Sequence, residues 1–218
     1  MVRLVMLADT HVPARARDLP DEVWSAVDAA DVVLHAGDWV SLDLVERLSR
    51  RARRLVGCFG NNDGPSIRAV LPEVAQVTLE DLRFVVVHET GAAQGRERRV
   101  AAAYPDADVV VFGHSHIPWD SVLPTEPGQA ATAAGSRTTE PSRRSEEFQA
   151  AATPRSPEVS RPPEVPRSSR SLRLLNPGSP TDRRRQPFCT YLTAEVHGRT
   201  LANVELHRLP PRTARHPR

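Results

Sequence analysis

Short apolar runs, rich in β-branched residues, recur along the first half of the chain, and each run ends in small or polar residues. A run without polar alternation is typical of a strand that is buried on both faces, as strands in parallel sheets are. The runs near Glu80 and Asp81 lie so close together that they predict a hairpin. The full set of these early runs is 2–7, 32–35, 54–58, 74–79, 82–88 and 108–112.

Segments with helical periodicity separate several of these runs. The segment that starts at Pro20 spaces its apolar residues on one helical face, and Ser41 is a favourable N-cap residue for the next segment. Strands and helices that alternate in this way predict an α/β fold. Helices are expected at 20–30, 41–50 and about 95–104, and later strands at 171–175, 188–196 and 201–206, the last two forming a hairpin.

Side chains that can bind metals follow five of the early runs. Carboxylate, amide and imidazole groups at the carboxyl ends of parallel strands can converge at one edge of a sheet. Each motif alone is weak, and Asn61 by itself fits an ordinary Asn/Asp/Gly turn. His35 lies inside an apolar run and is better interpreted as a core or supporting residue than as a ligand. The candidate ligands are Asp9, His11, Asp38, Asn61, His88, His114 and His116.

Composition sets broad limits on function. The chain has 218 residues and a formal net charge of +2, which favours one catalytic core and gives no reason to expect specific nucleic-acid binding. Cys58 and Cys189 form no disulfide framework, so a reducing cytoplasm is expected. The N-terminus is interpreted as a strand rather than a signal segment, and no apolar run reaches the roughly 20 residues that span a bilayer.

Residues 120–170 differ in composition from the rest of the chain. This segment contains eight prolines and few aliphatic residues, so it is predicted to be a disordered insertion that forms little regular structure. Its arginines could bind an acidic partner, but interspersed glutamates favour a solvated tether. The expected organisation is therefore a domain formed by 1–119 and 171–209, the insertion at 120–170, and a disordered basic tail at 210–218.

The ordered motifs resemble those of the calcineurin-like metallophosphoesterases. They are DxH at 9–11, GD at 37–38, GNxD at 60–63, the strand-end His88, GHxH at 113–116 and NPGS at 176–179. The chain is most similar to the small branch that contains the YfcE-like phosphodiesterases and the retromer small subunit. This resemblance implies a two-sheet β-sandwich flanked by helices, in four layers ordered αββα.

The resemblance also implies a site for two divalent metal ions. One ion would be held by Asp9, His11, Asp38 and His116, and the other by Asn61, His88, His114 and the shared Asp38. Manganese is the default expectation, with iron, zinc or nickel as alternatives. Two such ions would activate a bridging hydroxide for in-line attack on a phosphate ester.

Two positions depart from the family pattern. Asn62 stands where many larger relatives have histidine, and an amide cannot supply a proton to a leaving group at neutral pH. Glu89 stands where the branch more often has glycine, and its charge would repel a dianionic substrate. Monoanionic phosphodiesters with good leaving groups are therefore expected as substrates in preference to phosphomonoesters. Asn62 and Asp63 are candidates for substrate contacts or supporting roles.

A different class of function stays open at this point. A scaffold such as the retromer small subunit can tolerate a degraded site. The missing proton donor at Asn62 and the unusual insertion therefore leave a non-catalytic metal-binding scaffold or protein-interaction module of the same fold as the alternative to a hydrolase. The expected binding partner is a small-molecule phosphate ester, and no association with a membrane is expected. The sequence does not decide whether the protein forms a homo-oligomer.

Overall fold

Ten strands form two five-stranded sheets in the part of the chain that the computed structural model describes, residues 1–125 and 170–210. The first sheet has the order β10-β9-β1-β2-β3 and the second has the order β4-β5-β6-β8-β7. The strands of the first sheet are β1 (Val2–Leu7), β2 (Val32–Ala36), β3 (Leu55–Cys58), β9 (Cys189–His197) and β10 (Thr200–Leu209). Those of the second sheet are β4 (Val74–Leu79), β5 (Leu82–Val87), β6 (Val109–Phe112), β7 (Trp119–Thr125) and β8 (Arg170–Asn176).

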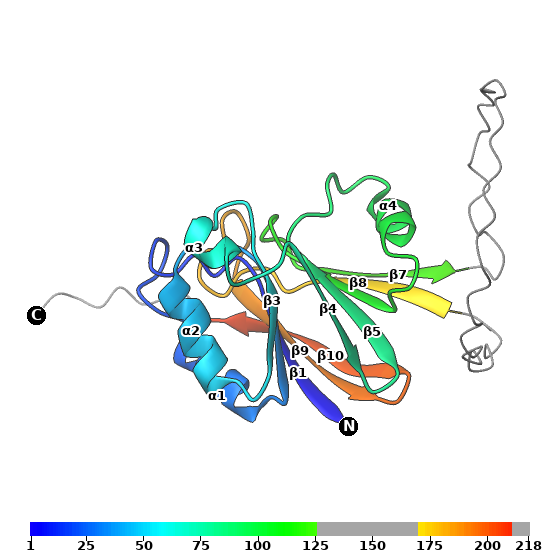
Figure 1. Ribbon diagram of the computed structural model, residues 1–218, viewed down its shortest axis with the longest axis horizontal. Helices are drawn as coiled ribbons and strands as arrows, with labels where there is room; N and C mark the ends of the chain where they lie inside the picture. The colour runs from blue at the N-terminus through cyan, green and yellow to red at the C-terminus, as the bar shows by residue number, and fades with distance from the viewer. Residues whose placement is uncertain (126–169, 211–218) are drawn as a thin grey trace, which may run out of the picture. The chain divides into compact units, whose positions relative to one another are not determined.

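The two sheets pack face to face around a shared apolar core (Figure 1). Successive side chains of a strand point to opposite faces, so Leu4 and Met6 of β1 enter this core while Val5 and Leu7 face the helices. In the second sheet Phe84 and Val86 of β5 likewise point inward. Burial on both faces explains why these strands are continuous apolar runs in the sequence.

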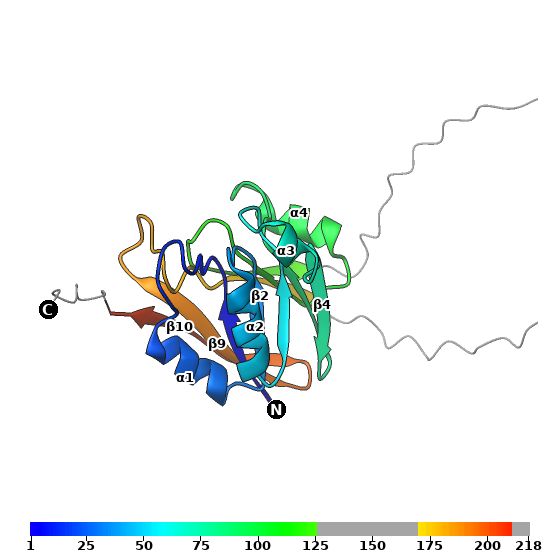
Figure 2. The same cartoon turned by 60° about the vertical axis from the view of Figure 1, so that its left-hand side comes forward.

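Helices cover the outer faces of both sheets, which gives the predicted four layers. Helices α1 (Asp21–Ala29) and α2 (Leu42–Arg51) pack on the first sheet, as Figure 2 shows. The expected N-cap residue Ser41 precedes α2, and its side chain accepts a hydrogen bond from the Asp43 amide. Helix α4 (Arg96–Ala103) packs on the second sheet through Val100. The fold class inferred from sequence is therefore confirmed.

Three consecutive parallel strands in each sheet position the candidate site. In the first sheet β1, β2 and β3 are parallel, and in the second β5, β6 and β8 are parallel. Their carboxyl ends come together at one rim of the sandwich, where the Nδ1 atom of His88, beyond β5, lies 2.8 Å from the carbonyl oxygen of Ala36, the last residue of β2. Loops that leave six strands thus meet across the two sheets.

The prediction that regular structure stops at residue 120 is wrong for residues 120–125, which belong to β7. Trp119 and Leu123 pack on the core of the second sheet while Asp120 and Val122 point outward, and Asp120 pairs with Arg173 of β8 at 2.7 Å. Pro124 argued against a strand in the sequence. A proline is nevertheless tolerated in an edge strand, because one side of that strand has no neighbouring strand to hydrogen-bond. Predictions for 126–169 and 211–218 lie outside the described residues.

Two smaller observations complete the fold. A short helix, α3 (Pro65–Arg68), follows the Asn61–Gly64 turn, and the sequence pattern did not reveal it. Proline at its first position suits a helix start, because that position needs no amide donor. Among the described helices, none combines the length and apolar character needed to cross a bilayer.

Candidate metal centre

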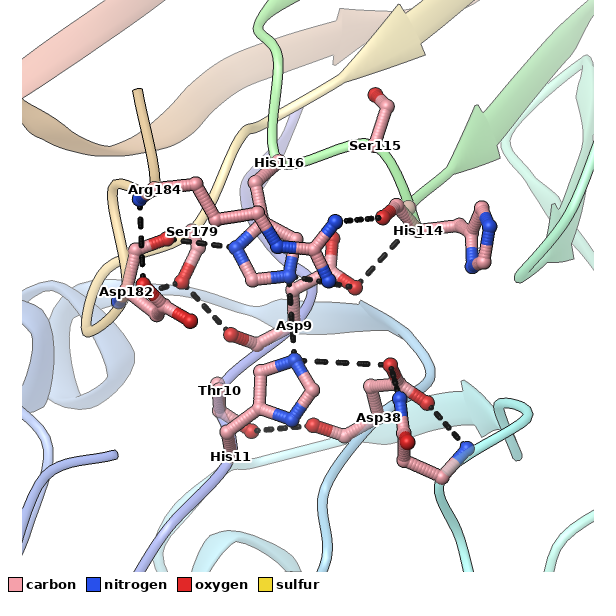
Figure 3. A network of polar contacts seen from close by, with 12 residues as sticks. Asp9, Thr10, His11, Asp38, His114, Ser115, His116, Ser179, Asp182 and Arg184 are labelled. Carbon is pink, nitrogen blue, oxygen red and sulfur yellow. Dashed lines mark hydrogen bonds and ion pairs between the residues drawn. The ribbon is translucent and has the colours of Figure 1, made fainter. Parts of the chain in front are cut away.

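A first group of candidate ligands comes from the loops after β1 and β6. Their side chains face one another: His11 Nε2 lies 3.2 Å from His116 Nε2, and His116 Nε2 lies 3.6 Å from Asp9 Oδ1 (Figure 3). All three residues are buried. Asp9, His11 and His116 therefore offer an oxygen and two nitrogens to one small volume.

A second group comes from the loops after β3, β5 and β6. The side-chain oxygen of Asn61 lies 2.9 Å from His88 Nε2 and 3.0 Å from His114 Nδ1. His88 is buried, whereas the side chain of His114 is 49% exposed and Asn61 is also exposed. This second group therefore opens toward solvent, and a substrate can approach it.

Asp38 lies between the two groups. Its Oδ2 atom is 3.5 Å from His11 Nε2 and its Oδ1 atom is 3.4 Å from His88 Nε2. The carboxylate thus presents one oxygen to each group from a fully buried position. The structure brings together all seven residues singled out in the sequence.

The backbone of this site adopts a conformation that most residues avoid. Five of the seven candidate ligands have positive φ angles, with values from 43° at His11 to 69° at His114, and the others are Asp9, Asp38 and His116. Left-handed residues of this kind cluster at functional sites, where the surrounding structure enforces them. The consequence here is that each loop turns sharply and directs its side chain back over the strand ends.

Gly37 permits the close approach of the two sheets at this rim. Its φ is +81°, and a Cβ atom built on it would lie 2.7 Å from His88 Nδ1. Both the backbone conformation and the contact therefore require glycine. Any larger residue would push His88 away from Asn61 and Asp38.

The electrostatics of the first group fit a bound cation. The Oδ2 atom of Asp9 is buried and has no hydrogen-bond partner, and burial raises the pKa of Asp9 to about 7. Burial also lowers the pKa of His116 to about 4 and depresses that of His11, so both imidazoles are neutral near pH 7. An unsatisfied carboxylate oxygen beside neutral imidazoles is the donor set of a transition-metal site.

The second group shows the same need for a cation. His88 Nδ1 lies 2.8 Å from the Ala36 carbonyl and donates to it, which directs the lone pair of Nε2 at the oxygens of Asn61 and Asp38. Burial opposes protonation of His88, but Asp38 outweighs burial and raises the pKa of His88. A lone pair that faces oxygen lone pairs needs a proton or a metal ion between them.

Asp63 supports the site instead of facing it. Its carboxylate accepts hydrogen bonds from the amides of Asp38, Val40 and Gly60 at 3.0, 2.8 and 2.7 Å. This buried carboxylate fixes the loop after β2 against the loop after β3. Asn62 contacts the site directly, because its side-chain nitrogen Nδ2 donates to Asp38 Oδ2 at 2.6 Å.

We expect Asp63→Asn to lower the free energy of unfolding by about 1–3 kcal/mol, the usual cost of leaving a buried hydrogen-bonding group unsatisfied. Asparagine can place only one acceptor oxygen where the carboxylate provides two, so at least one amide loses its partner. Urea unfolding followed by circular dichroism measures the change. Asp81→Asn, at an exposed position in the β4–β5 hairpin, is the matched control and should have little effect.

The NPGS segment braces the loop after β1. Ser179 is buried and donates to the carbonyl of Asp9 at 2.7 Å, and Thr181 donates to the carbonyl of Thr10 at 2.6 Å. The Asp182 carbonyl accepts from His116 Nδ1 at 2.6 Å, which leaves Nε2 of His116 available as a ligand atom (Figure 3). The sequence pattern pointed to Ser179 but missed Thr181 and Asp182, whose roles arise from backbone contacts.

Arg184 places positive charge at the rim of the site. Its guanidinium donates to the His114 carbonyl at 3.2 Å, and Figure 3 shows the side chain beside the ring of His116. Arg183, in contrast, donates to the nearby Gln186 carbonyl at 2.8 Å. Arg184 therefore contacts a candidate ligand, whereas the hydrogen bond of Arg183 is local.

His35 is a supporting residue, as its place within an apolar run indicated. It is fully buried, its ring stacks on Trp39 with centroids 3.4 Å apart, and its Nε2 atom lies 3.1 Å from the Thr10 hydroxyl. Burial lowers the pKa of His35 well below its usual range, so the ring is neutral. His35 therefore connects β2 to the loop that carries Asp9 and His11.

Sequence comparison finds relatives that are named as phosphoesterases. A probable metallophosphoesterase of Methanothermobacter thermautotrophicus is 29% identical over 116 residues, which cover 52% of this chain and 66% of that protein. A phosphodiesterase of Methanocaldococcus jannaschii is 25% identical over 143 residues, covering 59% of this chain and 84% of that protein. The chain thus spans just under two thirds of the length of the first relative.

Fold comparison extends over nearly the whole chain. The crystal structure of Vps29 from Entamoeba histolytica in complex with zinc matches with a TM-score of 0.57 at 16% identity, covering 95% of this chain and 98% of that one. The family model described as the calcineurin-like phosphoesterase superfamily domain matches residues 2–148, which is more than half of the sequence. The chain therefore belongs to the calcineurin-like phosphoesterase superfamily.

Proposed function

We propose that the chain is a metal-dependent phosphodiesterase that uses two divalent ions. The observation that carries this proposal is the position of Asp38, whose two carboxylate oxygens face two separate groups of nitrogen and oxygen donors. Asp9, His11, Asp38 and His116 would hold the first ion. Asp38, Asn61, His88 and His114 would hold the second, and the relative named a phosphodiesterase supports the same class of reaction.

Two bound ions would supply positive charge for the phosphoryl oxygens and lower the pKa of a water between them. The chain itself orients the donors: the carbonyls of Ala36 and Asp182 each accept from a histidine Nδ1, so that Nε2 of His88 and of His116 points into the site. Such outer contacts fix the ring orientation of a metal-binding histidine. Manganese is the metal that we propose, and we propose a cytoplasmic location.

The surroundings of the second group favour diesters. Glu89 places a carboxylate oxygen 3.5 Å from His114 Nδ1, on the side that opens to solvent. That charge opposes a dianionic monoester more strongly than a monoanionic diester. Asn62 donates to Asp38 and has no proton to give a leaving group, so substrates with good leaving groups should react fastest.

The test compares two model substrates under Mn²⁺. We expect bis(p-nitrophenyl) phosphate to be hydrolysed with a higher kcat/KM than p-nitrophenyl phosphate by the same purified protein. Metal-free protein prepared with a chelator is the control and should be inactive until Mn²⁺ is restored. A clear preference for the monoester would contradict the diester assignment, and metal-dependent turnover of either substrate would still support the broader phosphoesterase class.

A non-catalytic scaffold is the competing function, and the lack of a proton donor at Asn62 is the observation in its favour. Metal content measured on the same preparation separates the two functions. Retention of two ions per chain without turnover of any phosphate ester would favour the scaffold.

A further inference from the structure

Glu89 reaches the same space as the second group of ligands. Its Oε1 atom is 3.5 Å from His114 Nδ1, and one ligand atom from each of His88, Glu89 and His114 lies within 4.8 Å of the other two. The same two histidines both approach the Asn61 oxygen, at 2.9 and 3.0 Å. Two nitrogens and two oxygens therefore converge, of which the family resemblance accounts for all but the carboxylate of Glu89.

The loop that carries Glu89 is held in place by arginines of α4. The guanidinium of Arg99 donates to the carbonyls of Thr90, Ala92 and Gln94 at 2.9, 2.5 and 3.2 Å. Arg96 donates to the carbonyl of Gly91 at 3.3 Å. These hydrogen bonds fix the backbone that directly follows Glu89 against α4.

The carboxylate of Glu89 has little else to bind among the residues that the structure describes. Its close polar contact there is the His114 ring, and its side chain is 51% exposed. An ion pair at such an exposed position contributes little to stability. A role in stabilising the fold therefore does not account for a carboxylate beside two histidines.

We propose that Glu89 is an additional ligand of the second metal ion, alongside Asp38, Asn61, His88 and His114. This inference rests on the proposed function, since it concerns the same two-ion site. Mn²⁺, Fe²⁺ and Zn²⁺ can all bind a carboxylate oxygen, so the assignment does not require one particular metal.

The extra ligand changes the charge of the site. Asp9, Asp38 and Glu89 together offset all but about one unit of the positive charge of two divalent ions. A site with so little excess positive charge attracts a dianion only weakly. Glu89 thereby links metal binding to the preference for diesters through one side chain.

The experiment measures metal affinity and not turnover. Wild-type protein and Glu89→Gln are dialysed against a series of buffered Mn²⁺ concentrations, and bound metal is measured by mass spectrometry. We expect wild type to bind two ions, and Glu89→Gln to bind the first unchanged and the second at least about 10-fold more weakly. Glutamine has the same size and can still hydrogen-bond the His114 ring, so it retains an orienting role while losing the charged oxygen.

Glu97→Gln is the matched control, because it also replaces one glutamate by glutamine. Glu97 lies on α4, where it accepts a hydrogen bond from the Ser121 hydroxyl at 3.0 Å. It should bind both ions as wild type does. Equal affinity of wild type and Glu89→Gln for the second ion would overturn the assignment of Glu89 while leaving the two-ion site intact. Failure of the wild type itself to bind two ions would instead count against the proposed function, so the two failures are distinguishable.

Discussion

Asp38→Asn is expected to abolish metal-dependent hydrolysis and to weaken binding of both ions. The loss of affinity should exceed the ~10–100-fold typical of changes that merely remove support from a ligand, because the carboxylate faces both groups. Asparagine has nearly the same shape, so the effect will report the lost charge and the lost second oxygen. Bound Mn²⁺ per chain and kcat/KM on bis(p-nitrophenyl) phosphate measure the two effects.

The natural state of Asp38 explains why this substitution should be severe. Burial opposes ionisation of Asp38, but hydrogen bonds from His88 and Asn62 outweigh burial and hold the pKa of that carboxyl below its usual range. The group is therefore an anion in the folded protein, ready to bind cations. Asp28→Asn, at a surface ion pair with Arg51, is the control and should leave both measurements unchanged. Survival of hydrolysis and of two-ion binding in Asp38→Asn would refute the shared-ligand assignment.

Gly60→Ala is expected to damage both the stability of the protein and its metal site. A Cβ atom at this position would lie 2.5 Å from the backbone nitrogen of Asp38, and even closer to its Oδ1 atom. The backbone cannot move aside without a loss of stability. We therefore expect the substitution to lower the free energy of unfolding by about 1–3 kcal/mol, as overpacking of a tight interior does. The displaced Asp38 should then bind Mn²⁺ more weakly.

Gly64→Ala provides a matched comparison within the same turn. A Cβ atom there meets nothing within 4 Å, and the backbone of Gly64 has a φ of −75°, which any residue adopts. We expect Gly60→Ala to have a lower unfolding temperature and a weaker affinity for Mn²⁺ than wild type, and Gly64→Ala to be close to wild type in both. Thermal unfolding and Mn²⁺ titration measure these two quantities. If the two alanine variants behave alike, contact with Asp38 does not determine the need for glycine at position 60.

The sequence predicted the strands of the sandwich well because most of them are buried on both faces. Such strands become unbroken apolar runs, and the residues after each run then mark the strand ends. Strand β7 escaped notice because it is an edge strand with few inward apolar residues and a proline. The short helix α3 escaped because four residues carry too little periodicity to be recognised.

The family, the sandwich with its helical layers and the identity of the possible metal ligands could all be inferred from the sequence alone. These properties follow from local patterns: apolar runs, turn residues, and motifs in a fixed order. Three findings came from the packing of the chain: Asp38 lies between two groups of donors, Asp63 and Ser179 hydrogen-bond to the backbone, and Glu89 lies close to His88 and His114. These facts depend on distances between loops far apart in the chain, which the packing of the two sheets sets.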